Sequence, residues 1–328
     1  MVRLVLTNSA GDVDITNMII SISWEGDYSE CARSIEFSII SAVEDQNVGY
    51  VECELGQIVR MYYNGELLFF GYVFSRDKSM DSNSIDVKCF DRGIYLKKNE
   101  ASYNFDNTSP ESVTDKICSD FGIPQGSVAK TGIGVSRTFL GSSLYDIIMT
   151  SYTESSKQTG KKYIIRFTGE YLNVFEKNIS QNAVFIEGGY NLINAAFSDS
   201  IENMVNRIAI YNKDDQFVKY IENSDYMQMF GVMQEYMKQN DKDDKYAEAQ
   251  KKLDENGISR KVTVENIGDI RCITGNTVVL YEPYTGTYGS FLIDSDVHTW
   301  KNGIYVNKLT LNFKNIMDEK DAGSEPKE

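Results

Sequence analysis

Residues 56–73 read GQIVRMYYNGELLFFGYV, and this stretch decides the fold class of the chain. Asn64-Gly65 lies between two apolar runs and favours a type I′ turn, in which both central residues need a positive φ. The turn predicts an antiparallel hairpin whose strands pair without interruption as far as Val59 and Phe70. A third strand over 84–91 (SIDVKCFD) follows, so the three strands form a meander.

Both faces of this hairpin are apolar, although a hairpin with one solvated face should be polar on that side. One face is assigned to the core, and the other must be covered. The cover is either a neighbouring subunit, which we favour, or the central part of the same chain. The candidate subunit-interface residues are those of the second face and two tyrosines of a late loop: Ile58, Arg60, Tyr62, Leu67, Phe69, Tyr281 and Tyr284.

A short pattern, G-x-x-V-x-[ML]-Y, occurs twice, at residues 56–62 (GQIVRMY) and 275–281 (GNTVVLY). Each copy opens a run of strand, turn, strand, turn and strand. The repeat predicts two related β modules, and a chance likeness between short β patterns is the alternative. The expected fold is α+β and β-rich, with two related antiparallel β-barrel-like modules, a central α/β insertion and a few short helices.

Helical signals lie in the middle of the chain and near residue 250. Residues 108–111 form a T-x-x-E capping box before apolar residues at helical spacing, and residues 142–152 repeat that spacing behind a serine cap. Residues 161–177 predict a second hairpin. The expected domains are a first β-barrel-like module (1–100), an α/β domain (101–190), a second β-barrel-like module (191–315) with a helical insertion near 241–257, and a disordered tail (316–328).

The charge balance excludes several classes of partner. The chain has 48 acidic and 33 basic residues, a net charge of −15 at pH 7. Nucleic acids and anionic membranes attract Lys- and Arg-rich surfaces, so we expect binding to neither. No apolar stretch approaches the ~20 residues that cross a bilayer, and the start, MVRLVLTNSAG, is too short and too polar for a signal peptide. We therefore expect no stable membrane insertion and a cytoplasmic protein during assembly.

Few residues could support catalysis or metal binding. The five cysteines are scattered without a C-x-x-C pair, and the chain has one histidine, His298. This set predicts no disulfide framework, no metal site and no cofactor, and any triad would have to use His298. Because His298 lies at the end of a strand pattern, we expect it to be a hydrogen-bonded structural residue. We expect the protein not to be an enzyme.

The order of these segments resembles the XkdQ/YqbQ family of baseplate hub proteins, found in contractile phages and phage-tail-like bacteriocins and related to the late control protein D group and to the hub part of VgrG spikes. The likeness covers roughly residues 1–315 and lies in the order of the segments, not in a catalytic motif. The segments that carry it include 56–73, 91–100 (DRGIYLKKNE), 109–126 (SPESVTDKICSDFGIPQG), 143–152, 200–212 (SIENMVNRIAIYN), 275–281 and 293–313.

The resemblance implies a structural hub that forms a homotrimer. Two modules per chain would then present six positions to a hexameric tail tube. The implied partners are the tail tube or a tube-initiator protein, a central spike protein and baseplate wedge proteins. The implied location is the baseplate of a virion or tail-like particle, where the acidic charge would keep DNA from adhering to an axial channel.

Two other functions stay open at this point. The first is a tail-associated peptidoglycan hydrolase, which would need two carboxylates beside a cleft; with so many acidic residues, such pairs occur by chance. The second is a receptor- or glycan-binding module that uses the loop EPYTGTYG, with Tyr281, Tyr284 and Tyr288.

Overall fold

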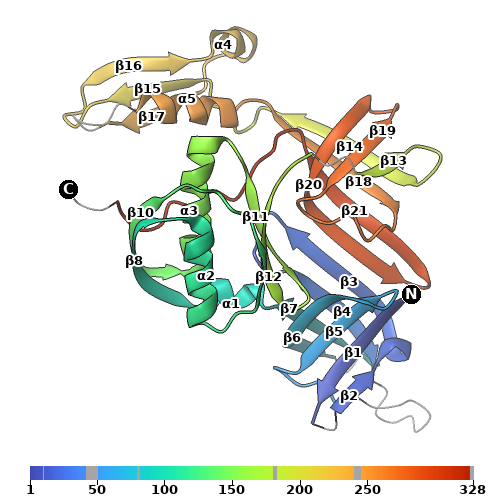
Figure 1. The fold of residues 1–328 in the computed structure, drawn as a ribbon. Helices are drawn as coiled ribbons and strands as arrows, with labels where there is room; N and C mark the ends of the chain where they lie inside the picture. The colour runs from blue at the N-terminus through green and yellow to red at the C-terminus, as the bar shows by residue number, and fades with distance from the viewer. Residues whose placement is uncertain (10, 42–50, 80–81, 180–182, 240–244, 326–328) are drawn as a thin grey trace. The chain divides into compact units, whose positions relative to one another are not determined.

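The computed structural model describes residues 1–328 apart from 10, 42–50, 80–81, 180–182, 240–244 and 326–328 (Figure 1). The described residues form 21 strands, five α-helices and one short 3-10 helix, η1 (Thr16–Met18). They fall into two compact units, Met1–Ala195 with Thr263–Glu328, and Ala196–Val262. The chain is β-rich with large antiparallel sheets, as its alternating patterns predict.

A sheet of 13 strands runs through the larger unit. Its main path has the order β14-β18-β21-β20-β3-β4-β7-β6-β5-β1-β2, and β19 and β13 are added beside β20. The strands of the first module are β1 (Val2–Asn8), β2 (Gly11–Asp14), β3 (Ile19–Asp27), β4 (Ser34–Ile40), β5 (Ile58–Tyr63), β6 (Glu66–Lys78) and β7 (Ser84–Asp91). Those of the second module are β13 (Val184–Glu187), β14 (Leu192–Ser200), β18 (Ser259–Ile267), β19 (Thr277–Glu282), β20 (Thr287–Lys301) and β21 (Ile304–Asn312).

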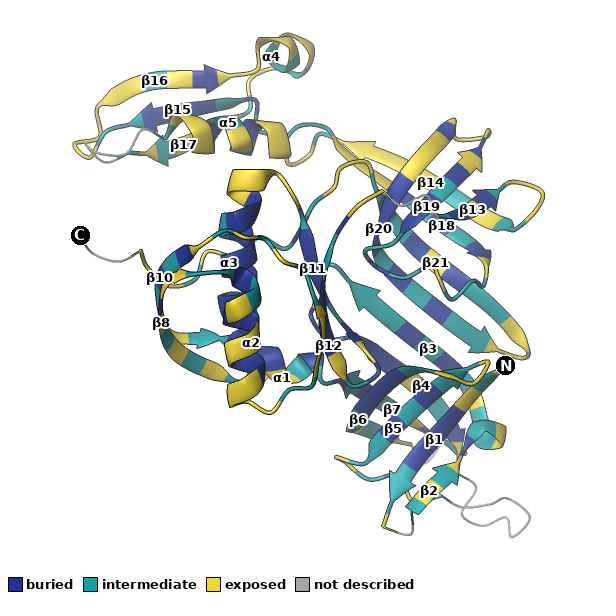
Figure 2. Cartoon of the chain, in the orientation of Figure 1, coloured by how far each residue is buried: buried dark blue, intermediate teal, exposed yellow. Residues whose placement is uncertain are grey.

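The two modules are continuous because β3 pairs with β20. Every second side chain along a strand of the first module points into its core. In β4, Ile35, Phe37 and Ile39 are buried, whereas Glu36 is exposed (Figure 2). The period-2 pattern predicted for RSIEFSII is thus confirmed.

The hairpin of β5 and β6 turns at Asn64-Gly65 as predicted, with φ angles of 50° and 91°. The predicted register holds next to the turn but is wrong beyond it, because Leu68 is an extra, bulged residue and Met61 pairs with Phe69. A one-residue bulge moves every following side chain to the opposite face. Phe69 therefore lies in the core with 2% exposure, and not on the second face of the hairpin.

The sequence repeat corresponds to a repeated set of backbone hydrogen bonds. In the first copy Gly56 donates to the carbonyl of Val73 at 2.8 Å, and Val73 donates back to the residue after the glycine at 2.9 Å. In the second copy Gly275 and Ile293 make the same two bonds, each 2.9 Å long. Both glycines have a positive φ, 81° and 88°, which suits the tight turn before each strand.

The third strand of each copy continues the correspondence. Val73 pairs with Cys89 on β7, and Ile293 pairs with Leu311 on β21. In both ladders the register shifts by one residue directly after this pair, and all four side chains are buried. The two modules therefore share turn, register and bulge, although few side chains are identical.

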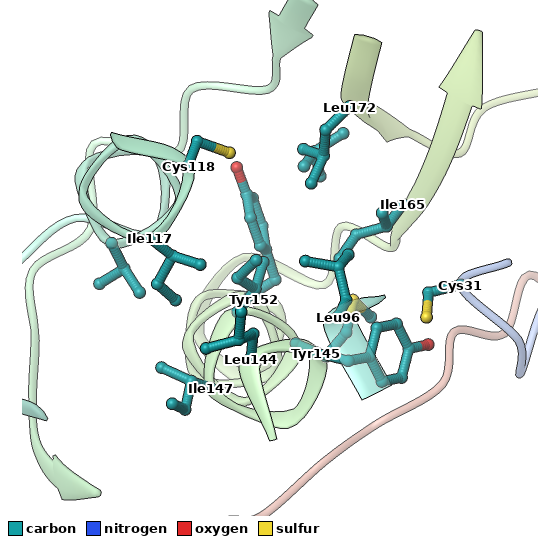
Figure 3. Close-up of a cluster of buried hydrophobic side chains, with 14 of the residues drawn as sticks. Cys31, Leu96, Ile117, Cys118, Leu144, Tyr145, Ile147, Tyr152, Ile165 and Leu172 are labelled. Carbon is teal, nitrogen blue, oxygen red and sulfur yellow. The ribbon is translucent and has the colours of Figure 1, made fainter. Parts of the chain in front are cut away.

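Helices and two small sheets form the central part of the larger unit (Figure 1). Its elements are α1 (Gly93–Lys98), β8 (Glu100–Thr108), α2 (Pro110–Asp120), β9 (Gln125–Val128), β10 (Val135–Ser143), α3 (Leu144–Thr159), β11 (Tyr163–Thr168) and β12 (Tyr171–Glu176). Helix α3 lies at the centre of its core, where Tyr145 and Tyr152 point between α1, α2 and the β11–β12 hairpin (Figure 3).

The cap of α2 differs from the predicted capping box by one residue. Ser109, and not Thr108, is the N-cap, and its hydroxyl accepts from the amide of Ser112 at 3.4 Å. The carboxylate of Glu111 instead accepts from the amide and hydroxyl of Thr131, so it fixes the loop after β9. The serine cap predicted for α3 is confirmed at Ser143.

The C-terminal tail is packed where a disordered segment was predicted. Met317 is buried in the central core, and the carboxylate of Asp318 accepts from the hydroxyl of Tyr145 at 2.8 Å. Ser324 forms a β-bridge with Thr138 through two 2.9 Å backbone bonds. The prediction was wrong for residues 316–325, because polar composition does not reveal that the buried hydroxyls of α3 offer partners to this backbone.

The smaller unit is a three-stranded sheet with two helices. Its elements are β15 (Arg207–Tyr211), β16 (Phe217–Glu222), α4 (Ser224–Phe230), β17 (Gln234–Lys238) and α5 (Tyr246–Glu255). Ala249 and Leu253 of α5 pack against Ile208, Ile210 and Ile221. Helix α5 lies within the range 241–257 where a helix was predicted, and the beginning of that range lies outside the described residues.

Candidate functional site

The second face of the β5–β6 hairpin is only partly accessible. Ile58, Arg60 and Tyr62 are all of intermediate exposure. The guanidinium of Arg60 donates to the Asp12 carboxylate at 3.1 Å and lies over the ring of Phe70, 5.5 Å from its centre. A cation on an aromatic face is stabilised by the ring quadrupole, so these contacts orient the Arg60 side chain over this face.

The central part of the chain covers a portion of this face. The backbone of Gly169, in the turn between β11 and β12, forms a parallel β-bridge with Phe69 beside Leu67. Arg92 lies over Phe70 at 5.4 Å and pairs with Glu170 of the same turn at 3.4 Å. The sequence left two candidates for covering this face, a neighbouring subunit or the central part of the same chain. The central part of the chain covers a portion of it.

The outer face of the second module is more exposed. Tyr281 of β19 pairs across the sheet with Tyr288 of β20, and their ring centres are 5.0 Å apart. Phe185 of β13 lies on the same face of the sheet, since it pairs with Val279, two residues before Tyr281 on β19. The three side chains are between 45% and 52% exposed, and Tyr284 at the hairpin tip is 99% exposed. We call Phe185, Tyr281 and Tyr288 the aromatic patch.

Phe185 was missed in the sequence because its strand has four residues and follows a polar stretch. The alternation in AVFIEGGY, where Val184 and Ile186 are buried and Phe185 is not, is the signal that could have identified it. The candidate residues thus separate into three groups: Phe69 lies in the core, Ile58, Arg60, Tyr62 and Leu67 are partly covered, and Tyr281 and Tyr284 are exposed.

A buried ion pair lies where β3 and β20 join the two modules. The Arg33 guanidinium donates to both carboxylate oxygens of Asp296, and both side chains are almost completely buried. Asp296 also accepts from the amide and hydroxyl of Thr274, at 2.6 and 2.5 Å. Burial alone would raise the pKa of Asp296, but the charge of Arg33 and the hydrogen bond from His298 outweigh it and lower that pKa. We call this arrangement the seam network.

His298 belongs to the seam network and is fully buried. Its Nε2 lies 3.0 Å from the carbonyl of Cys272 and 3.2 Å from the carboxylate of Asp296, so Nε2 carries the ring proton. Nδ1 then accepts from the side-chain amide of Asn307 at 2.8 Å. The histidine is hydrogen-bonded on both nitrogens, as the prediction of a structural residue requires.

Glycine makes the seam network possible. A side chain at Gly26 would place its first carbon 2.1 Å from Nη1 of Arg33, a distance at which something must move. The guanidinium of Arg33 also lies over the Trp24 ring, 4.1 Å from its centre. The first module therefore supplies a cation with its aromatic support, and the second module supplies the carboxylate.

In the part of the chain that the structure describes, no group of three or more His, Cys, Asp and Glu residues is arranged to hold a metal ion. No helix among the described residues has the length and apolar character to cross a bilayer.

The comparisons with known proteins agree with this architecture. The model of a family described as YQBQ-like matches residues 22–312. The phage-like element PBSX protein XkdQ of Bacillus subtilis (strain 168) is 26% identical over 91% of this chain and 94% of its own length. A 43 kDa tail protein of prophage MuSo2 from Shewanella oneidensis has a TM-score of 0.70, with 15% identity over 94% of this chain and 97% of that one. A tail protein from Neisseria meningitidis MC58 has a TM-score of 0.68, with 12% identity over 98% and 99%.

Proposed function

The chain belongs to the YQBQ-like family, and from that premise we propose that it is the hub of a contractile-tail baseplate. In this role three copies surround the tail axis and adapt the sixfold tail tube to a threefold central spike. The function is geometric: each chain presents two similar docking positions, so a trimer presents six.

The observation that carries this proposal is the repeat in the backbone. Gly56 with Val73 and Gly275 with Ile293 make the same hydrogen bonds and precede the same bulge. Two modules with one backbone geometry can present equivalent edges to two neighbouring subunits of a sixfold ring. The names of relatives and structural neighbours, which include phage-element and tail proteins, support the same setting.

The expected partners follow from the role. They are two further copies of this chain, the tail tube or a tube-initiator protein, the central spike and the baseplate wedge proteins. The aromatic patch and Tyr284 are the surfaces we assign to contacts with these proteins, because exposed Tyr and Phe are enriched at protein interfaces. The chain would be assembled in the cytoplasm and function in the particle, without catalysis and without binding nucleic acid.

We also propose that the chain has three functional parts, with boundaries near residues 100 and 190. The first and second modules would contact the tube, and the α/β part between them would hold the modules at a fixed angle. The seam network and the packed tail support such a rigid arrangement within the larger unit, because both join segments that are far apart in sequence.

The solution mass of the purified chain tests the proposal. Light scattering should give three times the mass of one chain at assembly concentrations, and addition of the tube-initiating and spike proteins should give a larger complex of defined composition. A single-chain mass with both neighbours present would overturn the hub assignment.

A further inference from the structure

A cavity of about 360 Å³ opens between the β11–β12 hairpin and the Gly275 turn, within the larger unit. Its lining combines apolar and polar side chains. The apolar ones are Ile164, Phe175 and Val184, and the polar ones include Arg166, Asn178 and Asn276. The cavity thus lies where the central part of the chain meets the second module.

Arg166 uses only a part of its hydrogen-bonding capacity. Its Nη1 donates to the carbonyl of Thr274 and to the side-chain oxygen of Asn276, both at 3.2 Å. Nε and Nη2 make no hydrogen bond to the described residues, and the side chain as a whole is of intermediate exposure. The guanidinium lies over the Phe175 ring, 4.9 Å from its centre, which holds the planar edge formed by Nε and Nη2 in place.

Arg166 also has no carboxylate within ion-pair distance in the described part of the chain, which distinguishes it from the other arginines that are partly or fully buried. Each of those has at least one: Arg33 with Asp296, Arg60 with Asp12, Arg76 with Glu54, Arg92 with Glu170, Arg137 with both Glu154 and Asp321, and Arg207 with Glu222. In a chain of net charge −15, such a cation is unexpected.

The surroundings of Arg166 do not neutralise its charge. Burial, and then the charge of Arg33, lower the pKa of Arg166 to about 10, and the charge of Asp296 opposes them only in part. Glu176 lines the cavity, but its carboxylate is paired with Lys161 at 2.9 Å. A half-buried cation without a counterion is costly, so an anion that enters the cavity gains the interaction that the chain leaves unmade.

We propose that this cavity binds a carboxylate, with Arg166 as its anchor. The planar edge formed by Nε and Nη2 matches the two oxygens of a carboxylate, which an arginine binds through parallel hydrogen bonds. The apolar lining residues suit the carbon stem of the acid. A second guanidinium that would favour a phosphate is not free, since Arg271 at the rim is bonded to Asp269 at 2.6 Å. The site goes beyond the hub role, because it needs neither a trimer nor a tail.

Saturation-transfer NMR with propionate tests the proposal on the full-length chain at constant ionic strength and pH 7.5. The wild type should bind propionate saturably. Arg166→Gln should bind about 10- to 100-fold more weakly, since a hydrogen bond to a charged group contributes about 1.5–3 kcal/mol. Arg166→Lys keeps the charge but not the planar edge and should also lose about tenfold. The matched control Arg207→Gln should bind like the wild type.

Several outcomes would overturn the proposal. They are the absence of saturable binding to the wild type, equal binding by Arg166→Gln, and binding of inorganic phosphate in preference to propionate. Thermal unfolding of each variant separates lost binding from lost folding. If Arg166→Gln does not fold, the comparison between the wild type and Arg166→Lys decides.

Discussion

The two β modules share a backbone geometry but differ in the charge of corresponding side chains and in how far other parts of the chain cover their outer faces. Three residues after Val73 the first module has Arg76, and three residues after Ile293 the second module has Asp296. Both reach back to the turn that contains the module's glycine: Arg76 donates to the carbonyl of Cys53 at 2.5 Å, and Asp296 accepts from the amide of Thr274 at 2.6 Å. The side chain at this position thus stabilises the turn in both modules, as a hydrogen-bond donor in the first and as an acceptor in the second.

The difference in cover matters for function. The first module's outer face is partly filled by Arg60, Arg92 and the β11–β12 turn, whereas the aromatic patch of the second module is exposed. Backbone equivalence therefore does not make the two surfaces chemically equivalent. If six positions surround a tube, they alternate between two kinds of side-chain surface.

The largest effect is expected where the two modules meet. Arg33→Met leaves Asp296 buried without its cation, and we expect the free energy of unfolding to fall by about 3–5 kcal/mol. Urea denaturation measures this change. The counterpart Arg76→Met removes a pair that solvent reaches, and should cost about 1 kcal/mol or less. Equal losses would show that the seam network has no special role.

The next effect concerns pH and Asp91, at the end of β7. Burial raises the pKa of Asp91 to about 7, although the amides of Arg33 and Gly93 donate to its carboxylate. An unfolded aspartate ionises near pH 4, so between about pH 4 and 7 only the folded chain keeps this proton. The free energy of unfolding should therefore fall as pH rises through this window, by at most about 4 kcal/mol, and level off above it.

Thermal unfolding between pH 4 and 8 tests this dependence. Asp91→Asn should flatten the slope, because the amide stays neutral throughout. Asp296 does not contribute to the slope in this window. Because its pKa is lowered in the folded chain, the stabilisation that it provides is lost only when the pH falls below about 4. The corresponding residue of the second module, two positions after Leu311, is the exposed Phe313 and has no proton to release. An unchanged slope in Asp91→Asn would contradict the assignment.

The two turn glycines offer a matched pair of smaller effects. Alanine at either position must adopt a positive φ, which costs about 1 kcal/mol. At Gly56 the added carbon meets no atom within 4 Å, whereas at Gly275 it lies 3.2 Å from Ile164. We expect a loss of about 1 kcal/mol for Gly56→Ala and about 2 kcal/mol for Gly275→Ala in chemical denaturation. The reverse order would indicate that the β11–β12 hairpin does not support the second turn.

The smallest effect on folding is expected at the aromatic patch. Tyr281→Ser changes an exposed side chain and should alter the free energy of unfolding by no more than about 0.5 kcal/mol. Tyr62→Ser, its counterpart under Arg3, should cost about 1 kcal/mol. If the patch is a subunit contact, Tyr281→Ser should weaken association at least tenfold by light scattering, and unchanged association would remove it from the interface.

Much of the architecture was predictable because it depends on local chemistry. The Asn64-Gly65 turn, the alternation in β4 and the cap of α3 are fixed by neighbours in sequence. The register of β6 was not predictable beyond the turn, since the bulge at Leu68 depends on how Phe69 packs in the core. The packed tail escaped prediction for a similar reason, as its partners lie on α3, far away in the chain.

The sequence by itself determined the β-rich class, the two copies of the glycine turn and the structural character of His298, because turn geometry, alternation and residue counts act over short distances or over the whole composition. Only the tertiary structure decided which candidate interface residues are exposed, which partly buried arginine has no ion pair with the described residues, and where the modules meet. Those properties depend on side chains that are brought together from distant segments, and burial and pairing are defined only once the chain has folded.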